Sequence, residues 1–299
     1  MVTPLTQRPR SGPYSGLNAR SAKRFLTQAF RDAGLPFAED DALEIVLSAT
    51  GFDKTALMLR GTEFLDPGIF QTITDHMQRR LSGEPVDHIL GWREFYGRRF
   101  KISKDVLSPR ADTETLIRGA LLRGDQTRPA KLLDLGTGSG AIGLTLLAES
   151  ALWTLHATDI SDAALRIAKA TTRDLELLER VNVFKGEWYK AVPRGETYDI
   201  ILSNPPYITN AAMETLETEV TAYDPDIALR GGNDGLDAYR LIIASAPDYL
   251  ISGGWLGLEI GYDQAEALKN LLTDTVWADV SVNQDLSGHD RTVWARKKF

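Results

Sequence analysis

The fold is decided by residues 132–143, which read LLDLGTGSGAIG. Leu132, Leu133 and Leu135 form an apolar run of strand length, and three closely spaced glycines follow before a second apolar run begins. Glycine tolerates positive φ and lets the backbone approach a ligand closely. The pattern therefore predicts a buried strand, a ligand-binding turn and the start of a helix. By itself, such a turn could equally serve a nicotinamide dinucleotide.

Two details of this turn favour a cofactor that carries an amino acid. Asp134 lies inside the strand end, where a carboxylate would attract an ammonium group and repel a pyrophosphate. The glycines also lack the two-residue spacer that precedes the third glycine of the dinucleotide fingerprint. S-adenosylmethionine therefore fits this site better than a dinucleotide does.

Strand-like and helix-like segments alternate after this turn. The expected strands are residues 131–135, 153–158, 181–184, 199–203 and 255–259, and the intervening helices include 163–179, 236–251 and 264–273. This order predicts a mostly parallel sheet with helices on both faces. The segments 278–285 and 292–296 predict a closing hairpin with an antiparallel last strand. We therefore expect an α/β, Rossmann-like sheet of seven strands, as in S-adenosylmethionine-dependent methyltransferases.

Polar or aromatic side chains follow three further expected strands. Asp159 ends the second strand, where it could accept hydrogen bonds from ribose hydroxyls or cap the following helix. Trp188 follows the third strand, where its ring could rest on a purine or pack in the core. Glu259 ends the fifth strand and could simply be a satisfied polar residue.

Residues 198–207 read YDIILSNPPY and combine a buried strand with an unusual ending. Asn204 follows the apolar run, and Pro205 and Pro206 then fix an extended path that cannot continue a sheet. The amide carbonyl of Asn204 and a backbone carbonyl can accept the hydrogens of an NH2 group, while Tyr207 packs on its plane. This motif predicts a site for a planar nitrogen group and resembles the signature of methyltransferases that act on such nitrogens.

The first part of the chain has a different composition. Residues 1–17 are rich in proline, glycine and arginine and read as a tail, with an organellar transit peptide as the alternative. Residues 18–85 predict a small helical domain, 86–108 a hairpin linker and 109–299 the sheet domain. Arg110 is either a surface ion-pair residue or a neighbour of the cleft.

Composition excludes several functional classes. The 299 residues contain no cysteine and only four scattered histidines, so we expect no disulfide and no metal site. A net charge of −7 disfavours tight binding to long nucleic acid, and no apolar run reaches membrane-spanning length. We expect a soluble monomer of the cytoplasm, or of an organellar matrix if the basic N-terminus directs targeting.

These motifs together resemble the PrmC/HemK family of protein-(glutamine-N5) methyltransferases. The resemblance covers nearly the whole chain after the tail. It rests on the following segments in family order: Gly83-Glu84-Pro85, Glu94-Phe95-x-Gly97, Pro109-Arg110-x-x-Thr113-Glu114, residues 134–140, Asn204-Pro205-Pro206-Tyr207, Asp224-Pro225 with Ala228-Leu229, Gly231-Gly232-x-Asp234-Gly235-Leu236 and Asp285-Leu286-x-Gly288-x-Asp290-Arg291.

The resemblance implies a substrate and a set of site residues. The substrate would be the glutamine of the Gly-Gly-Gln motif in class 1 peptide chain release factors, methylated with S-adenosylmethionine. The implied cofactor contacts are Asp134, Gly136, Thr137, Gly138, Ser139, Gly140, Asp159, Trp188 and Asn204. The implied substrate contacts are Asn204, Pro205, Pro206 and Tyr207, with Phe100 as a candidate wall, and the catalytic positions are Asn204, Pro205 and Tyr207.

Two other functions compete with this interpretation. Methylation of an exocyclic amine of adenine or guanine would use a similar site, although the acidic balance of the chain argues against it. A non-catalytic cofactor-binding protein is the other possibility, but the intact glycine turn, Asp159 and the Asn-Pro-Pro-Tyr motif argue against lost activity.

Overall fold

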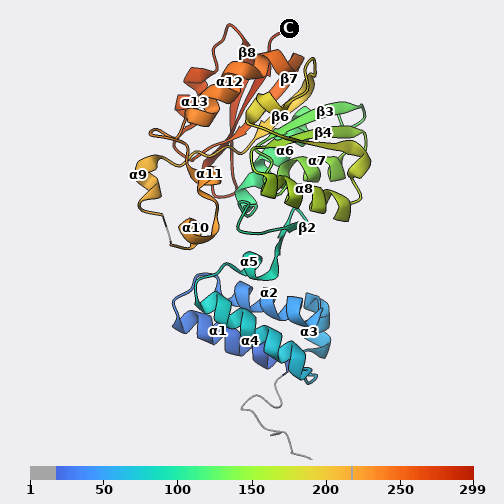
Figure 1. Cartoon of the computed structure of the whole chain (residues 1–299), viewed down its shortest axis with the longest axis vertical. Helices are drawn as coiled ribbons and strands as arrows, with labels where there is room; N and C mark the ends of the chain where they lie inside the picture. Colours follow the sequence, from blue (N-terminus) through green and yellow to red (C-terminus); the bar gives the residue numbers. More distant parts are fainter. Residues whose placement is uncertain (1–17, 217) are drawn as a thin grey trace, which may run out of the picture. The chain divides into compact units, whose positions relative to one another are not determined.

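The computed structural model describes residues 18–216 and 218–299. The expectations for residues 1–17 therefore lie outside the described residues. The chain divides into two compact units between Leu90 and Gly91 (Figure 1). None of the described helices is long and apolar enough to cross a membrane.

The first unit is the expected helical domain. Its helices are α1 (Ala19–Asp32), α2 (Ala38–Thr50), α3 (Lys54–Arg60), α4 (Pro67–Leu81) and α5 (Val86–Leu90). Asp66 caps α4 by accepting a hydrogen bond from the Gly68 amide at 2.7 Å, as the Asp-Pro pair predicts. The core of this unit includes the fully buried Phe30 and Ile45. Phe25 of α1 is 46% exposed.

The segment after α4 is divided between the two units. The helical domain was expected to end at residue 85, but Val86 and Leu90 of α5 pack on its core. The hairpin that follows, β1 (Trp92–Phe95) and β2 (Arg98–Lys101), belongs to the second unit. The Lys101 amide donates to Thr171 Oγ1 at 3.3 Å, so the hairpin is docked on the sheet unit and is not a free linker.

The second unit contains the expected seven-stranded sheet in the order β5-β4-β3-β6-β7-β9-β8. Its strands are β3 (Ala130–Leu135), β4 (Trp153–Asp159), β5 (Val181–Lys185), β6 (Tyr198–Ser203), β7 (Leu250–Glu259), β8 (Trp277–Gln284) and β9 (Asp290–Lys297). The strands β3 to β7 are mutually parallel, and β9 runs antiparallel to both β7 and β8. The chain order changes direction between β3 and β6, the point where parallel sheets bind ligands.

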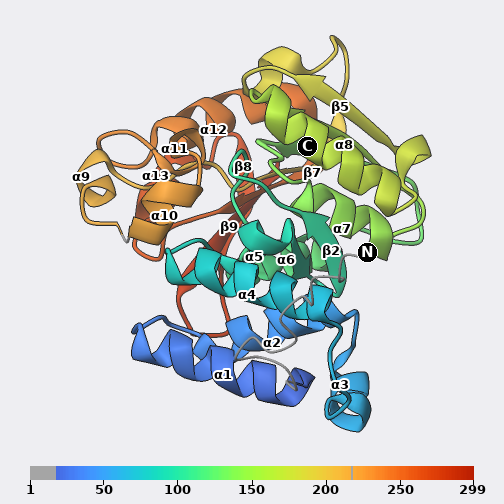
Figure 2. The ribbon, with the colours of Figure 1, turned by 60° about the horizontal axis from the view of Figure 1, so that its bottom comes forward.

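Helices cover both faces of this sheet (Figures 1 and 2). They are α6 (Glu114–Arg123), α7 (Ala141–Glu149), α8 (Asp162–Asp174), α12 (Asp237–Tyr249) and α13 (Ala265–Leu271). Three short helices, α9 (Asn210–Met213), α10 (Thr218–Tyr223) and α11 (Asp226–Leu229), lie in the segment between β6 and α12. Side chains alternate along each strand, so Leu132 and Ile200 pack with α6 and α7. Leu133 and Ile201 pack with α12 and α13 on the opposite face.

Candidate functional site

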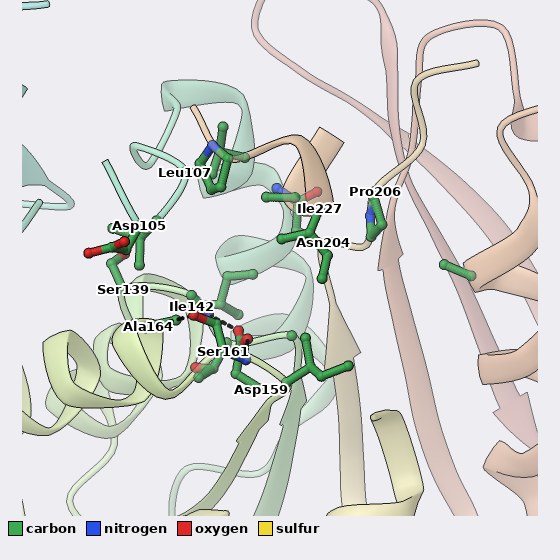
Figure 3. Close-up of a pocket in the computed structure, with 18 of the residues that line it drawn as sticks. Asp105, Leu107, Ser139, Ile142, Asp159, Ser161, Ala164, Asn204, Pro206 and Ile227 are labelled. Carbon is green, nitrogen blue, oxygen red and sulfur yellow. Dashed lines mark hydrogen bonds between the residues drawn. The ribbon is translucent and has the colours of Figure 1, made fainter. Parts of the chain in front are cut away.

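A cavity of about 630 Å³ opens at the carboxyl ends of the parallel strands, within the second unit. Its wall includes residues that follow β3, β4, β5 and β6, together with parts of α8, α11 and α12. A volume of this size suits a cofactor or another small organic molecule. Figure 3 shows Asn204 and Pro206 toward one end of this set of residues and Asp159 and Ser161 toward the other.

The glycine turn forms one wall of the cavity. Gly136, Gly138 and Gly140 have φ values of 69°, 56° and 85°, so each occupies the left-handed region that glycine favours. A Cβ on Gly138 would contact nothing within 4 Å, whereas one on Gly136 would lie 3.4 Å from the Trp188 ring. The turn therefore leaves space on its open side for a ligand to approach the backbone. Thr137 and Ser139 line the same wall.

Asp134 lies beneath this turn and is fully buried. Its Oδ2 accepts hydrogen bonds from Thr137 Oγ1 at 2.6 Å and from the Gly143 amide at 3.2 Å. Its Oδ1 is buried with no hydrogen-bond partner among the described residues. Burial raises the pKa of Asp134 to about 6. This orphaned carboxylate oxygen would suit a cationic amino group, but Asp134 is not among the residues that line the cavity, so its contact with a cofactor stays a prediction.

Asp159 joins the turn to the end of β4. Its Oδ2 accepts from the Gly138 amide at 2.9 Å, and its Oδ1 accepts from the Ser161 amide at 2.9 Å. Each carboxylate oxygen can accept a second hydrogen bond, so Asp159 retains capacity for two hydroxyl groups in the cavity. Burial raises its pKa above the usual range. The N-cap of α8 is Ser161, so Asp159 does not have the helix-capping role that the sequence left open for it.

Trp188 lies on the cavity wall after β5. Its φ of 47° is unusual for a residue with a large side chain, and such backbone strain concentrates at functional sites. The preceding Gly186 also lines the cavity, and a Cβ there would lie 2.8 Å from the Ala191 Cβ. This tight turn presents the indole ring toward the glycine turn, where a flat ring of a ligand could pack on it.

The Asn-Pro-Pro-Tyr motif directly follows β6. Asn204 and Pro206 line the cavity, whereas Pro205 is buried behind it. Ser203 Oγ donates to the Leu135 carbonyl at 2.7 Å and so joins the end of β6 to the start of the glycine turn. The structure thus brings Asn204 to the same cavity as Asp159 and the glycines.

Five of the predicted site residues lie outside the set that lines the cavity: Asp134, Gly140, Pro205, Phe100 and Tyr207. The Phe100 ring is fully buried and makes an edge contact with the Phe95 ring at a centroid distance of 5.9 Å. Its hydrophobic packing in the core explains why the structure does not bring it to the cavity. Tyr207 is partly buried against the core beside α12, and burial raises its pKa. Arg110 lines the cavity, so of its two predicted roles, surface ion-pair residue or neighbour of the cleft, the structure favours the second.

Several cavity residues were not identified from the sequence. The loop before α6 contributes Leu107 and Ser108, and α11 contributes Asp226, Ile227 and Ala228. Asp224-Pro225 and Ala228-Leu229 belong to a motif of the resembling family, but no local pattern shows that this segment folds back to the cavity. That return is made through hydrogen bonds from the Ile208 amide to the Leu229 carbonyl at 2.9 Å and from the Gly231 amide to the Ile208 carbonyl at 2.8 Å.

Glu259 lies fully buried at the end of β7. Its Oε2 has no hydrogen-bond partner among the described residues. Burial raises the pKa of Glu259 to about 7, although a hydrogen bond from the Thr113 side chain and the positive charge of Arg291 oppose this rise. The sequence suggested that the Glu259 carboxylate has hydrogen-bond partners, and this expectation is wrong for Oε2.

Comparison with known proteins identifies both units. Residues 21–91 match the PrmC N-terminal domain, and residues 115–222 match the methyltransferase small domain. A solved catalytic domain of human Mettl16, in complex with an RNA hairpin, aligns with a TM-score of 0.57 at 18% identity, covering 85% of this chain and 92% of that one. A methyltransferase from Pyrococcus furiosus aligns with a TM-score of 0.50 at 18% identity, covering 76% of this chain and 100% of that one. These likenesses establish the methyltransferase fold.

Curated relatives give the family. A release factor glutamine methyltransferase of Bradyrhizobium diazoefficiens is 42% identical over 291 residues, which cover 96% of this chain and 97% of the relative. One of Cereibacter sphaeroides is 41% identical over 280 residues, which cover 94% of this chain and 99% of the relative. The chain therefore belongs to the release factor glutamine methyltransferase family.

Proposed function

We propose that this chain transfers a methyl group from S-adenosylmethionine to the side-chain amide nitrogen of the glutamine in the Gly-Gly-Gln motif of class 1 release factors. The family supports the substrate class, since its curated members are named for release factor glutamine. The names of these relatives do not favour the alternative acceptor, an exocyclic amine of adenine or guanine. The observation that carries the proposal is the shared cavity of Asn204 and the glycine turn.

The cofactor would be held by residues around the glycine turn. Asp134 offers an orphaned carboxylate oxygen for an ammonium group, and Asp159 has capacity for two ribose hydroxyls. Trp188 offers a ring for the adenine to pack against. S-adenosylmethionine supplies, when bound, a sulfonium methyl group that a nitrogen nucleophile can attack.

The protein contributes mainly alignment to this reaction. An amide nitrogen is a poor nucleophile because its lone pair is delocalised into the carbonyl, so holding it at attack distance is worth more than a strong base. The Asn204 side-chain carbonyl and the Pro205 backbone carbonyl would accept the two hydrogens of the glutamine NH2 group. Tyr207 lies outside the set of residues that lines the cavity, but it directly follows Pro206 and would pack on the amide plane. The proton would leave to water after transfer.

Mass spectrometry of a release factor incubated with the chain and S-adenosylmethionine tests this function. We expect one added methyl group, located on the glutamine of the Gly-Gly-Gln motif. A release factor with alanine at that position is the control and should gain no methyl group. Transfer to RNA or DNA, with none to the release factor, would refute the proposal. We expect the chain to act as a monomer in the cytoplasm, with no stable nucleic-acid or membrane partner.

A further inference from the structure

The side-chain amide of Gln264, just before α13, lies behind the Asn-Pro-Pro-Tyr loop. Its Nε2 donates to the Tyr207 carbonyl at 3.1 Å and to the Gly235 carbonyl at 3.3 Å. Its Oε1 accepts from the Gly261 amide at 3.0 Å and from the Tyr239 hydroxyl at 3.4 Å. This residue is 8% exposed, so all four interactions are shielded from water.

The orientation of this amide is determined by its partners. The Gly261 amide is an obligate donor and must face Oε1, whereas the Tyr207 and Gly235 carbonyls are obligate acceptors and must face Nε2. Rotating the Gln264 amide by half a turn would place Nε2 against the Gly261 N–H and Oε1 against the Tyr207 and Gly235 carbonyl oxygens. Gln264 therefore anchors the Tyr207 carbonyl through a specific donor.

The loop itself offers few other places for an anchor. Pro205 and Pro206 have no N–H group, so the backbone at these positions can be held only through carbonyl oxygens or by packing. The packing comes from two glycines. A Cβ on Gly231 would lie 2.7 Å from the Tyr207 Cα, and one on Gly235 would lie 2.4 Å from the Tyr207 carbonyl oxygen.

The anchor is rigid on its other side as well. The single hydroxyl hydrogen of Tyr239 is directed mainly to the Glu259 carbonyl at 2.8 Å and is shared with Gln264 Oε1 at the longer distance of 3.4 Å. Tyr239 is fully buried in α12. The Gln264 amide is thereby tied to the end of β7, the strand that pairs with β6 next to the site.

We infer that Gln264 is a positioning residue that fixes the loop of Asn204 to Tyr207 in the geometry needed for methyl transfer. This inference rests on the proposed function, in which that loop aligns the glutamine amide. A displacement of about 1 Å at a reacting group can cost roughly 100-fold in rate. The effect of Gln264 should therefore appear in kcat and not in the affinity for S-adenosylmethionine.

The variant Gln264→Glu tests this role with a pH profile. The introduced carboxyl keeps an oxygen for the Gly261 amide but replaces the donor toward Tyr207 with a second oxygen. Burial among carbonyl oxygens raises the pKa of such a carboxyl. At high pH its charge repels the Tyr207 carbonyl, and kcat should fall roughly 10- to 100-fold relative to the wild type. At low pH the protonated carboxyl can donate again, and the kcat ratio should recover.

Two further variants make the result interpretable. Gln264→Met has a similar volume and no donor, so it should lower kcat at every pH without recovery. Gln126→Glu alters an amide that donates to a backbone carbonyl, that of Leu121 at 3.2 Å, but it is exposed and lies outside the cavity wall. This control should match the wild type throughout. Gln264→Met also provides the test if Gln264→Glu does not fold.

The outcomes separate this inference from the proposed function. A wild type that methylates no release factor refutes the function. A wild type that is active, with Gln264→Glu and Gln264→Met both retaining its kcat, refutes the positioning role. A loss for Gln264→Glu that is independent of pH, accompanied by an equal rise in KM for S-adenosylmethionine, also refutes it. A pH-dependent loss in kcat with that KM unchanged supports it.

Discussion

The Gly138 amide donates a hydrogen bond of 2.9 Å to Asp159 Oδ2, which joins the glycine turn after β3 to the end of β4. The two residues are brought together because β3 and β4 are adjacent and parallel. Asp159 therefore has two functions in the proposed site. It shapes the turn that approaches the cofactor, and it presents acceptor capacity to the cavity.

The variant Asp159→Asn should bind S-adenosylmethionine more weakly. An amide has only one acceptor oxygen, so it cannot accept from both Gly138 and Ser161 and still face two hydroxyls. Losing one or two hydrogen bonds to a charged acceptor costs about 1.5–3 kcal/mol, or a roughly 10- to 100-fold rise in Kd. Isothermal titration calorimetry measures this directly. Asp162→Asn, at an exposed carboxylate paired with Lys185, is the control and should leave Kd unchanged.

Binding of S-adenosylmethionine should weaken as the pH falls through 6. The pKa of Asp134 in the free protein is about 6, and only the charged carboxylate attracts an ammonium group. Below that pH, binding must first remove a proton, so Kd rises toward tenfold per pH unit. Titrations between pH 5 and pH 7 should show this slope for the wild type. The variant Asp134→Asn should bind weakly and lose the part of this slope that Asp134 contributes, while Asp159, whose pKa is also raised, can still contribute. A flat wild-type profile would contradict the assignment.

Glu259→Gln should change how stability depends on pH. The pKa of Glu259 rises from 4.5 to about 7 on folding, so the folded state binds more protons than the unfolded state in this window. The wild-type free energy of unfolding therefore contains a favourable contribution below pH 4.5 that is lost as the pH rises to 7. The linked change is about 3 kcal/mol. A neutral glutamine lacks this linkage, so the variant should gain stability relative to the wild type as the pH rises.

Urea denaturation of both proteins between pH 5 and pH 8 measures this difference. Glu266→Gln is the matched control, since Glu266 is exposed and paired with Lys269 in a surface ion pair. Its difference from the wild type should be small at every pH. Parallel curves of unfolding free energy against pH for Glu259→Gln and the wild type would contradict this prediction. They would show that Glu259 is already charged at pH 5 in the folded protein.

The parts of the fold that could be predicted are those with a strong local signal. The strand β6 was expected at 199–203 and is found at Tyr198–Ser203, because an uninterrupted apolar run must be buried. The glycine turn was equally clear. The helix α8 is shorter than expected. It ends at Asp174, and the φ of 59° at Glu176, two residues later, is incompatible with a continuing helix. The strand β7 begins at Leu250, five residues earlier than expected, because Gly253 and Gly254, which resemble a turn, lie inside it.

The remaining parts of the site depend on contacts between distant residues. Gln264 contacts the Tyr207 carbonyl across 57 positions of sequence, and a single glutamine before a short helix carries no signal of this contact. The same holds for Ile227, which reaches the cavity only because the chain returns at Leu229 to pair with Ile208. Phe100 is the reverse case, because the family resemblance implied it as a candidate wall for the substrate, whereas its side chain packs in the core.

The variant Asn204→Ala gives the most direct test of the alignment mechanism. It removes the side-chain carbonyl that would accept one hydrogen of the glutamine NH2 group, so the nitrogen loses its fixed orientation. Removing one such preorganised contact should lower kcat roughly 100-fold or more. Single-turnover methyl transfer with labelled S-adenosylmethionine measures this step separately from product release. Asn182→Ala, at an exposed position of β5, should react like the wild type. Near-normal turnover of Asn204→Ala would mean that another group orients the amide.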